Sequence, residues 1–253
     1  MKWQRGVSQY DGLLARCAPG THEAAADVLR RHGLARGSVL DLAAGTGALL
    51  ARLRDIGFTD LNAVELDLPV FGLAGVTPLA VDLNTEFAAR FDRRFDVVTA
   101  VEIMEHLNCP RYFLREIHKL LEPGGHLLLS TPNIAHWVGR LSFLMRGELR
   151  YFKEGDYHHQ RHISAMNDTH IRLALREVGF RVIEFRTAGS FYGPLKKLLT
   201  APAAGLCRLL QGPLATGDVV LYLAQAVEPD QTSTGRSSAT YIHRHRLAAA
   251  ASA

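Results

Sequence analysis

The apolar residues in the central part of the chain alternate between two spacings. Short runs rich in Val, Ile and Leu predict buried strands, and apolar residues three and four positions apart predict helices that pack one face on a core. Strands are expected at residues 39–42, 61–66, 78–81, 95–101, 126–129, 181–185 and 218–226. Strands that alternate with helices at this spacing are typical of a parallel sheet with right-handed crossovers.

Local start and stop signals bound the helices between these strands. The helix after the first strand is expected to end before Gly57, because a glycine commonly follows the last helical residue. Pro110 predicts the start of another helix, which Pro123 and the two glycines after it would end. A further helix is expected from about residue 168 to residue 179.

Two segments interrupt this rhythm. Residues 134–166 hold five aromatic residues and four histidines without a clean period, and they predict a lid inserted after the fifth strand. A second insertion is expected over about 188–216, where prolines and a glycine break an apolar run. Residues 228–253 are rich in Ser, Thr and Ala and predict a disordered tail. The folded domain is therefore expected over 1–227.

Composition and charge narrow the class of protein. The 253 residues are 47% hydrophobic and 21% charged, as is usual for a globular chain. A net charge of +4, from 29 Lys and Arg against 25 Asp and Glu, is small and scattered, which weighs against a nucleic-acid partner. Three distant cysteines, a polar N-terminus and the lack of any long apolar run predict a cytoplasmic protein with reduced thiols.

The turn after the first strand carries the sharpest chemical signal. Gly45 and Gly47 allow the backbone to approach a ligand beside a helix N-terminus. A dinucleotide site would need a third glycine where this chain has Leu50, and Asp41 would repel a pyrophosphate. Asp41 instead suits a ligand that carries an amino group.

Two further acids follow the next strands. Glu65, near the end of the second strand, can accept hydrogen bonds from both hydroxyls of a ribose, and Asp82, after the third, can receive the exocyclic amine of adenine. A ligand with an amino acid, a ribose and an adenine is S-adenosylmethionine. His22, at the start of the helix before the first strand, can reach the carboxylate of that ligand; a surface histidine is the alternative.

These residues, in this order and spacing, resemble the class I S-adenosylmethionine-dependent methyltransferases over about residues 21–226. The resemblance implies an α/β, Rossmann-like, doubly wound sheet of seven strands whose last strand is antiparallel. The one departure from the commonest form of the glycine motif is the pair Ala43 and Ala44 before Gly45. The cofactor-binding residues that the resemblance implies are Asp41, Ala43, Gly45, Gly47, Glu65, Asp82, Leu83 and Val101.

A second group of polar residues follows the fourth strand, at the sheet edge where cofactor and acceptor meet in this class. Its residues Glu102, Glu105 and His106 resemble those of the ubiquinone-biosynthesis and natural-product O-methyltransferases, and His106 is expected to act as the general base.

The same segment also resembles the metal motif of the small-RNA 2′-O-methyltransferases, in which two glutamates and two histidines hold a divalent ion. The matching positions here are Glu102, Glu105, His106 and His162, a ligand set that suits Mg²⁺, Mn²⁺ or Zn²⁺. The alternative is that Glu105 and His106 cap a helix and shape the pocket without a metal.

The sequence therefore predicts a methyltransferase that uses S-adenosylmethionine to methylate a hydroxyl of a small molecule: a phenol or catechol, a sugar, or a polyketide-like alcohol. His106 is the expected base, with Glu105 and His162 assisting or ligating a metal. Two alternatives stay open, namely a non-catalytic partner protein on the same fold and an RNA ribose 2′-O-methyltransferase.

Basic residues lie among leucines in the second insertion. Lys196, Lys197 and Arg208 alternate there with five leucines that predict either a cap packed on the sheet or a peripheral contact with a membrane surface. The leucines are Leu195, Leu198, Leu199, Leu206 and Leu209.

Overall fold

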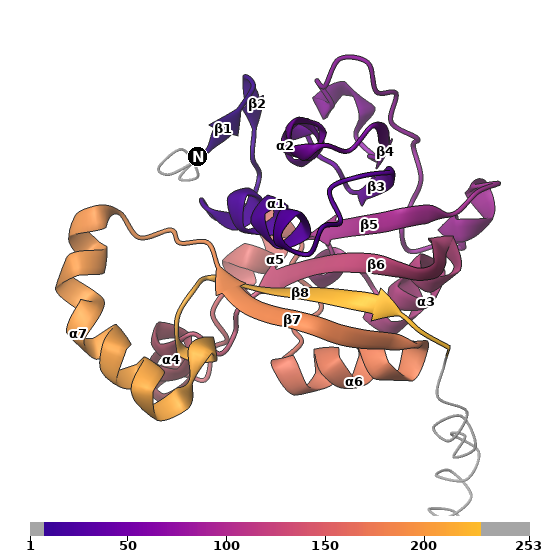
Figure 1. Ribbon diagram of the computed structural model, residues 1–253. Coiled ribbons are helices and arrows are strands. Elements are labelled where there is room, and N and C mark those ends of the chain that lie inside the picture. Colours follow the sequence, from indigo (N-terminus) through magenta and orange to yellow (C-terminus); the bar gives the residue numbers. More distant parts are fainter. Residues whose placement is uncertain (1–7, 229–253) are drawn as a thin grey trace, which may run out of the picture.

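A six-stranded sheet forms the centre of the protein in a computed structural model, which describes residues 8–228 (Figure 1). Its strand order is β4-β3-β5-β6-β8-β7. The strands are β3 (Ser38–Leu42), β4 (Asp60–Val64), β5 (Phe95–Val101), β6 (Leu121–Pro132), β7 (Phe180–Ala188) and β8 (Val219–Ala226). β3, β4, β5 and β6 pair in parallel, whereas β8 is antiparallel to both β6 and β7. The expected antiparallel last strand is confirmed.

The expected third strand, residues 78–81, is reduced to a single parallel bridge between Leu79 and Val64. Pro78 has no N–H to donate to a ladder, and Thr85 N donates to Asp82 O at 3.1 Å in a turn that leads the chain away. The main sheet of the described chain therefore has six strands where seven were expected.

Helices cover both faces of the sheet. α1 (Thr21–Arg31) and α2 (Ala48–Ile56) pack on one face, and α3 (Pro110–Leu120) and α6 (Asp168–Val178) pack on the other (Figure 1). The predicted helix ends are confirmed, since α2 stops before Gly57 and α3 starts at its proline.

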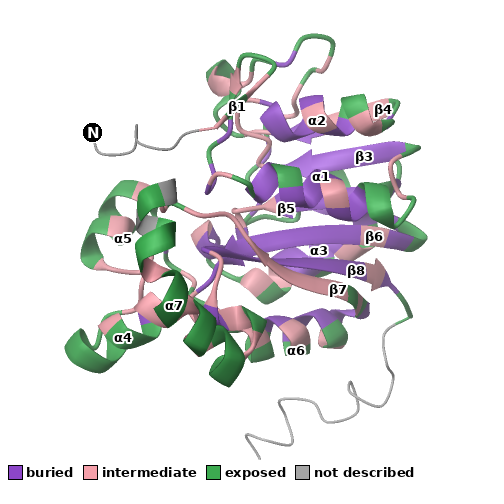
Figure 2. Cartoon of the chain, turned by 60° about the vertical axis from the view of Figure 1, so that its left-hand side comes forward, coloured by how far each residue is buried: buried purple, intermediate pink, exposed green. Residues whose placement is uncertain are grey.

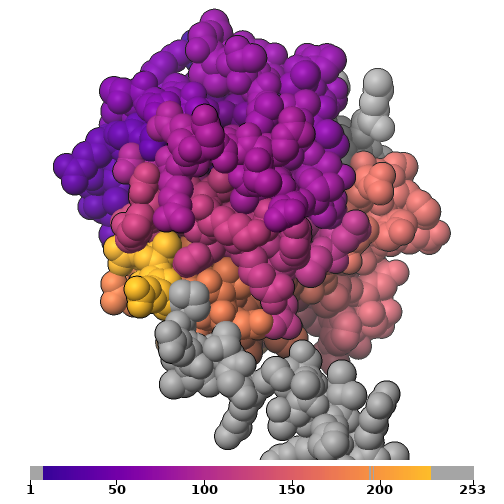
Figure 3. Space-filling model, turned by 90° about the vertical axis from the view of Figure 1, so that its right-hand side faces the viewer, coloured from indigo at the N-terminus to yellow at the C-terminus, as the bar shows by residue number. Residues whose placement is uncertain are grey.

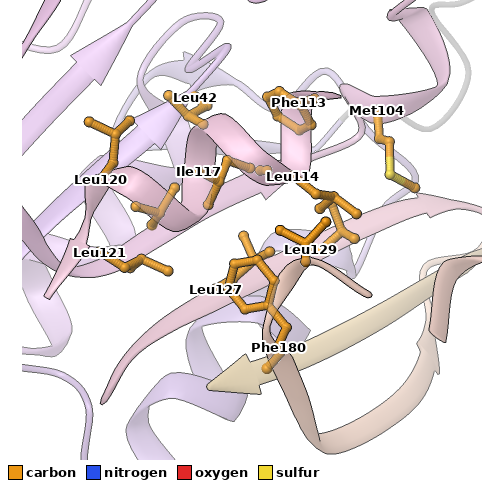
Figure 4. Packing of buried hydrophobic residues seen from close by; sticks show 14 of the residues in the cluster. Leu42, Met104, Phe113, Leu114, Ile117, Leu120, Leu121, Leu127, Leu129 and Phe180 are labelled. Carbon is orange, nitrogen blue, oxygen red and sulfur yellow. The ribbon is translucent and has the colours of Figure 1, made fainter. Parts of the chain in front are cut away.

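Alternate residues of each strand enter two separate apolar layers, because successive side chains of a strand point to opposite faces. Val39 packs with α1 and α2, whereas Leu40 packs with α3 and α6. Figure 4 shows the second layer, in which Ile117 of α3 lies close to Leu127 and Leu129 of β6. This two-sided core holds the strand ends in place.

The two interrupting segments contain helices that gather at one end of the molecule, beyond the carboxyl ends of the parallel strands (Figures 1 and 2). α4 (Trp137–Arg146) and α5 (Glu154–Gln160) lie in the segment expected as a lid, and α7 (Pro194–Gln211) lies in the second insertion. Figure 3 faces the opposite end, where residues of the middle of the chain form most of the visible surface.

Short elements complete the described chain. They are β1 (Gln9–Tyr10), β2 (Leu13–Leu14), and the 3-10 turns η1 (Leu68–Val70), η2 (Phe87–Arg90), η3 (Met104–His106) and η4 (Pro213–Ala215). No helix within residues 8–228 has both the length and the hydropathy needed to cross a membrane. The predicted disordered tail, apart from Glu228, lies outside the described residues.

Candidate active site

The turn between β3 and α2 places its backbone in conformations that favour glycine. Ala43, Gly45 and Gly47 all have positive φ, at 59°, 56° and 87°. A Cβ on Gly47 would lie 2.7 Å from the Cβ of Leu73, so this glycine permits close packing of the 71–73 segment on the turn. The turn thus leads directly into the N-terminus of α2, as the sequence predicted.

A hollow beside this turn collects residues from three parts of the chain. It is lined by Leu14, Arg16, Cys17, His22, Ala43, Ala44, Gly45, Thr46 and Ala48. The small sheet of β1 and β2 reaches the turn, since Thr46 Oγ1 donates to Leu14 O at 2.8 Å. His22 Nδ1 is buried and has no hydrogen-bond partner within the described residues. Burial, with a smaller contribution from the charge of Arg52, lowers the pKa of His22 to about 4.

Sequence reasoning singled out His22 but missed Arg16. Arg16 precedes α1 and stands in no motif, so only the folding of the β1–β2 segment against the glycine turn brings it to the hollow. The aliphatic part of Arg16 lies next to Gly45, because a Cβ on Gly45 would be 3.9 Å from Arg16 Cδ.

The two acids nearest the turn differ in their surroundings. Asp41 is 3% exposed, and Thr99 Oγ1 donates to its Oδ1 at 2.6 Å. Burial raises the pKa of Asp41 to about 7, and the charge of Glu65 adds to that rise. Glu65 accepts hydrogen bonds from Gly45 N at 2.7 Å and from Asp67 N at 2.9 Å. Asp41 thus lies within β3 just before the turn, and Glu65 follows the end of β4, as the sequence predicted, and contacts the turn through Gly45 N.

The residues expected at the adenine occupy the turn after Leu79. Asp82 is exposed, and its Oδ1 accepts a hydrogen bond from Asn84 N at 2.9 Å. The Leu83 side chain is buried in the core, so only its backbone is available to a ligand. Val101, the last residue of β5, is half-buried against the layer formed by α1 and α2.

The exit of β5 is a tight turn that carries two carboxyl groups, one half-buried and one buried. Glu102 has a φ of 55°, unusual for a residue with a side chain, and Ser130 Oγ donates to its Oε1 at 2.9 Å. Glu105 is 1% exposed, and its Oε2 accepts a hydrogen bond from Thr131 Oγ1 at 3.0 Å. The other oxygen of Glu105, Oε1, has no hydrogen-bond partner within residues 8–228.

His106 and His162 meet beside that unpaired oxygen. Their ring centroids are 4.8 Å apart, and His106 Nε2 lies 3.8 Å from Glu105 Oε1. His162 Nδ1 lies 2.6 Å from the carbonyl oxygen of Tyr151, a contact that requires Nδ1 to carry the proton and leaves Nε2 with its lone pair. The N–H groups of Ile163 and Ser164 donate to Glu105 O, which ties the two segments together.

Three of the four predicted metal ligands therefore come together. One ligand atom from each of Glu105, His106 and His162 lies within 4.8 Å of the others. Glu102 is not a member of this group; its Oε1 is bonded to Ser130 instead.

Burial shifts the pKa values of all four groups toward their neutral forms. It raises the pKa of Glu105 well above the ordinary value, helped by the charge of Glu102, and it raises the pKa of Glu102 to about 7. Burial also lowers the pKa values of His106 and His162, and His162 lowers that of His106 further. At neutral pH the His106 imidazole is therefore uncharged.

The charge of Glu102 influences residues of two parts of the site, the hollow at the glycine turn and the turn at the exit of β5. Burial raises the pKa of Cys17 to about 12, and the next contribution is the charge of Glu102. Because Cys17 lines the hollow at the glycine turn, the charge of Glu102 acts both on that hollow and on Glu105.

A third group of polar residues, centred on Asp218, holds the two interrupting segments to the sheet. The sequence did not predict this group. Asp218, the residue before β8, is 2% exposed and accepts hydrogen bonds from Tyr151 Oη at 2.5 Å, from Arg150 Nη2 at 2.9 Å and from Phe191 N at 2.7 Å. Asp218 therefore joins the chain after α4 and the chain before α7 to the strand next to β6. These partners are far apart in sequence and carry no local signal.

The sheet order, the glycine turn and the acids at the strand ends together define a class I S-adenosylmethionine-dependent methyltransferase. A family model described as "Methyltransferase domain" matches residues 12–185, and the chain belongs to this family of enzymes.

The curated relatives include ubiquinone biosynthesis O-methyltransferases. The one from Pseudomonas paraeruginosa is 36% identical over 110 residues, which are 41% of this chain and 47% of the relative. The one from Acinetobacter baylyi is 27% identical over 176 residues, 65% of this chain and 71% of the relative. The match thus spans about half the length of the first of these relatives.

Solved structures share the fold at low identity. An S-adenosylmethionine-dependent methyltransferase from Archaeoglobus fulgidus superposes with a TM-score of 0.54 at 17% identity, covering 81% of this chain and 95% of the other. Magnesium protoporphyrin IX methyltransferase from Synechocystis gives a TM-score of 0.53 at 16% identity, covering 81% of each. The [4+2]-cyclase SpnF gives 0.57 at 17% identity, covering 88% and 86%. This level of similarity shows the fold and not the reaction.

Proposed function

We propose that this enzyme transfers a methyl group from S-adenosylmethionine to a hydroxyl oxygen of a small molecule, with His106 as the general base. The observation that carries the proposal is the uncharged His106 imidazole beside Glu105 and His162, at the exit of β5, the strand that pairs with β3. Oxygen as the methyl acceptor is favoured by the O-methyltransferase names of the relatives.

The hollow at the glycine turn suits the amino-acid end of the cofactor. Arg16 and the unpaired His22 Nδ1 are assigned to its carboxylate, and Asp41 is assigned to its ammonium group. Glu65 would accept the ribose hydroxyls once the cofactor competes with Gly45 N for its oxygens. Asp82 and the backbone of Leu83 are assigned to the adenine.

Methyl transfer from a sulfonium needs a nucleophilic oxygen in line with the breaking C–S bond. His106 accepts the hydroxyl proton as the O–C bond forms, and the C–S electrons return to sulfur, which leaves a methyl ether, S-adenosylhomocysteine and a protonated imidazole. The lowered pKa of His106 keeps its lone pair free at neutral pH, and solvent then takes the proton.

The residues at the β5 exit also fit a divalent cation. The buried Glu105 Oε1 lacks a partner, and the hydrogen bond from His162 Nδ1 to the Tyr151 carbonyl is the outer contact that ligating histidines usually make. We propose that Glu105, His106 and His162 hold Zn²⁺, Mn²⁺ or Mg²⁺. Such an ion would supply Lewis-acid polarisation of the acceptor hydroxyl. One nitrogen of His106 can either bind the ion or accept the hydroxyl proton, but it cannot do both at once.

A phenol or catechol is the acceptor class we favour, because the curated relatives are named for O-methylation in ubiquinone biosynthesis and a quinone is an aromatic-derived ring. Sugar and polyketide-like alcohols are the other small-molecule candidates. RNA ribose methylation by the metal motif described above would need the divalent cation. The charge of the chain is small and scattered, so it does not favour an RNA substrate.

Transfer of labelled methyl groups to a panel of catechols, phenols, sugars and a short RNA tests the proposal. His106→Ala is expected to lower kcat by roughly 10²-fold or more and to leave the affinity for S-adenosylhomocysteine unchanged. The control is His159→Ala, since His159 is exposed on α5. Equal activity of the two variants on every acceptor would refute the role of His106.

A further inference from the structure

α7 is an amphipathic helix whose apolar face is open to solvent. Its leucines recur at spacings of three, four, seven and eight, so all of them lie on one side of the helix. They are Leu195, Leu198, Leu199, Leu206, Leu209 and Leu210, and each is between 58% and 83% exposed. We refer to these six residues as the leucine face.

The opposite side of α7 is the one nearer the body of the protein. Thr200, Ala204 and Cys207, at spacings of four and three, are its half-buried residues. Figure 1 shows α7 at the margin of the molecule, and Figure 2 shows exposed residues along it. The prediction that this segment packs as a cap on the sheet is wrong for the leucines, because the sheet does not cover them.

α4 adds a second apolar surface at the same end of the molecule (Figure 2). Leu141, Leu144 and Met145 lie on one side of this helix, at spacings of three and four, and are between 48% and 82% exposed. An apolar surface of this extent usually marks a binding surface.

The charges in these two helices all have one sign. Lys196, Lys197 and Arg208 lie in α7, and Arg140 and Arg146 lie in α4, whereas neither helix contains an Asp or a Glu. The whole chain is nearly balanced, with 29 basic and 25 acidic residues, so these two helices concentrate positive charge relative to the rest of the chain. Its partner is therefore expected to be both apolar and anionic.

We propose that α7, together with α4, docks this protein on the surface of a bilayer that contains anionic lipids. The leucine face would enter the boundary between headgroups and acyl chains, and the negative potential of the lipid surface would attract the basic residues of the two helices. A second copy of the chain is a poorer occupant, because a symmetric contact through these helices would bring like charges together.

Docking in this way would present the candidate active site to the membrane. α4 follows β6 and α7 follows β7, so both helices extend from the sheet end that carries His106 and His162. An acceptor dissolved in lipid would meet the enzyme there. The binding itself does not depend on the proposed reaction, and its test requires no methyl transfer.

Flotation of the full chain with vesicles tests the proposal. We expect binding to vesicles of phosphatidylcholine with phosphatidylglycerol, weaker binding at high salt, and little binding to phosphatidylcholine alone. The double variant Leu198→Gln and Leu209→Gln should lose affinity by roughly tenfold or more, because two exposed leucines no longer enter the bilayer. Lys197→Glu with Arg146→Glu should abolish the preference for anionic vesicles.

Leu173→Gln is the matched control, since Leu173 is 52% exposed on α6. Circular dichroism should show that all variants are folded, as the substituted side chains lie at the surface. Unchanged vesicle binding of the leucine variant would overturn the proposal. So would a dimer in solution that binds no vesicles and that the same variant dissociates, because the leucine face would then be an interface between copies.

Discussion

The carboxyl group of Asp41 links burial at the glycine turn to cofactor binding. Burial raises its pKa to about 7, so the group is mostly protonated below this pH and ionised above it. Only the ionised form attracts the ammonium group of the cofactor. The affinity for S-adenosylhomocysteine should therefore rise as the pH increases from 6 to 8, by roughly tenfold.

Calorimetric titration at several pH values measures this effect, and Asp41→Asn supplies the control. The asparagine cannot ionise, so its affinity should be low and nearly independent of pH. Glu102 has a pKa of about 7 as well. A pH dependence that persisted in Asp41→Asn would assign the effect to Glu102 or another group and contradict the role of Asp41.

The unpaired oxygen of Glu105 leads to a prediction about metal binding. Competition with a chromophoric chelator should show one tight Zn²⁺ or Mn²⁺ per chain, and Glu105→Gln or His162→Ala should weaken it by roughly 10–100-fold or more. Glu102→Gln removes a half-buried carboxyl outside the cluster and should change metal affinity little. Equal losses in Glu102→Gln and Glu105→Gln would show that the ligand set differs from the one assigned.

Asp218 attaches two segments of the chain to the sheet, so its contacts bear on the packing of whole elements. Its carboxylate holds Arg150 and Tyr151 from one segment and the backbone of Phe191 from another. Asp218→Asn would leave the half-buried guanidinium of Arg150 without its counter-charge, and we expect a loss of about 3 kcal/mol in the free energy of unfolding. Urea denaturation measures it.

The control for that prediction is an exposed ion pair in the same segment. Lys153 Nζ lies 3.1 Å from Glu148 Oε2, and their side chains are 36% and 52% exposed. Glu148→Gln should cost less than about 1 kcal/mol, as exposed pairs usually do. Similar losses for Asp218→Asn and Glu148→Gln would mean that the Asp218 contacts contribute little to stability.

Most elements could be predicted from the sequence, and the failures have physical causes. The strand at Phe95–Val101 and the helix at Asp168–Val178 agree with expectation, because continuous apolar runs and capping residues are local signals. The strand expected at 78–81 is not formed, because a proline and a following turn leave this segment with a single bridge to the sheet. The helix α7 was not predicted, since Pro202 and Gly205 within it are ordinarily helix breakers.

At the scale of the whole molecule, stability is expected to be unevenly distributed. The sheet and its four covering helices share the two buried apolar layers, whereas α4 and α7 contribute few buried side chains. Amide hydrogens of β5, β6 and β8 should therefore exchange slowly, through global unfolding, while those of α7 exchange through local opening. Hydrogen exchange followed by mass spectrometry measures this difference. Equally slow exchange in α7 would imply that something covers its leucine face in solution.

The sequence by itself determined the class of the protein. The alternation of strands and helices, the glycines of the β3–α2 turn, and the acids Asp41 and Glu65 at the strand ends are encoded by neighbouring residues. Their positions follow from periodicity, from backbone conformations open to glycine, and from the fact that parallel strands end at one edge.

Only the tertiary structure decided which distant residues meet. His106 and His162 come from different elements, Arg16 reaches the glycine turn through β1 and β2, and Asp218 gathers donors from two segments. The structure also decided that the leucine face of α7 points to solvent and not to the sheet. A periodic pattern defines the apolar side of a helix, but the path of the chain determines what that side contacts.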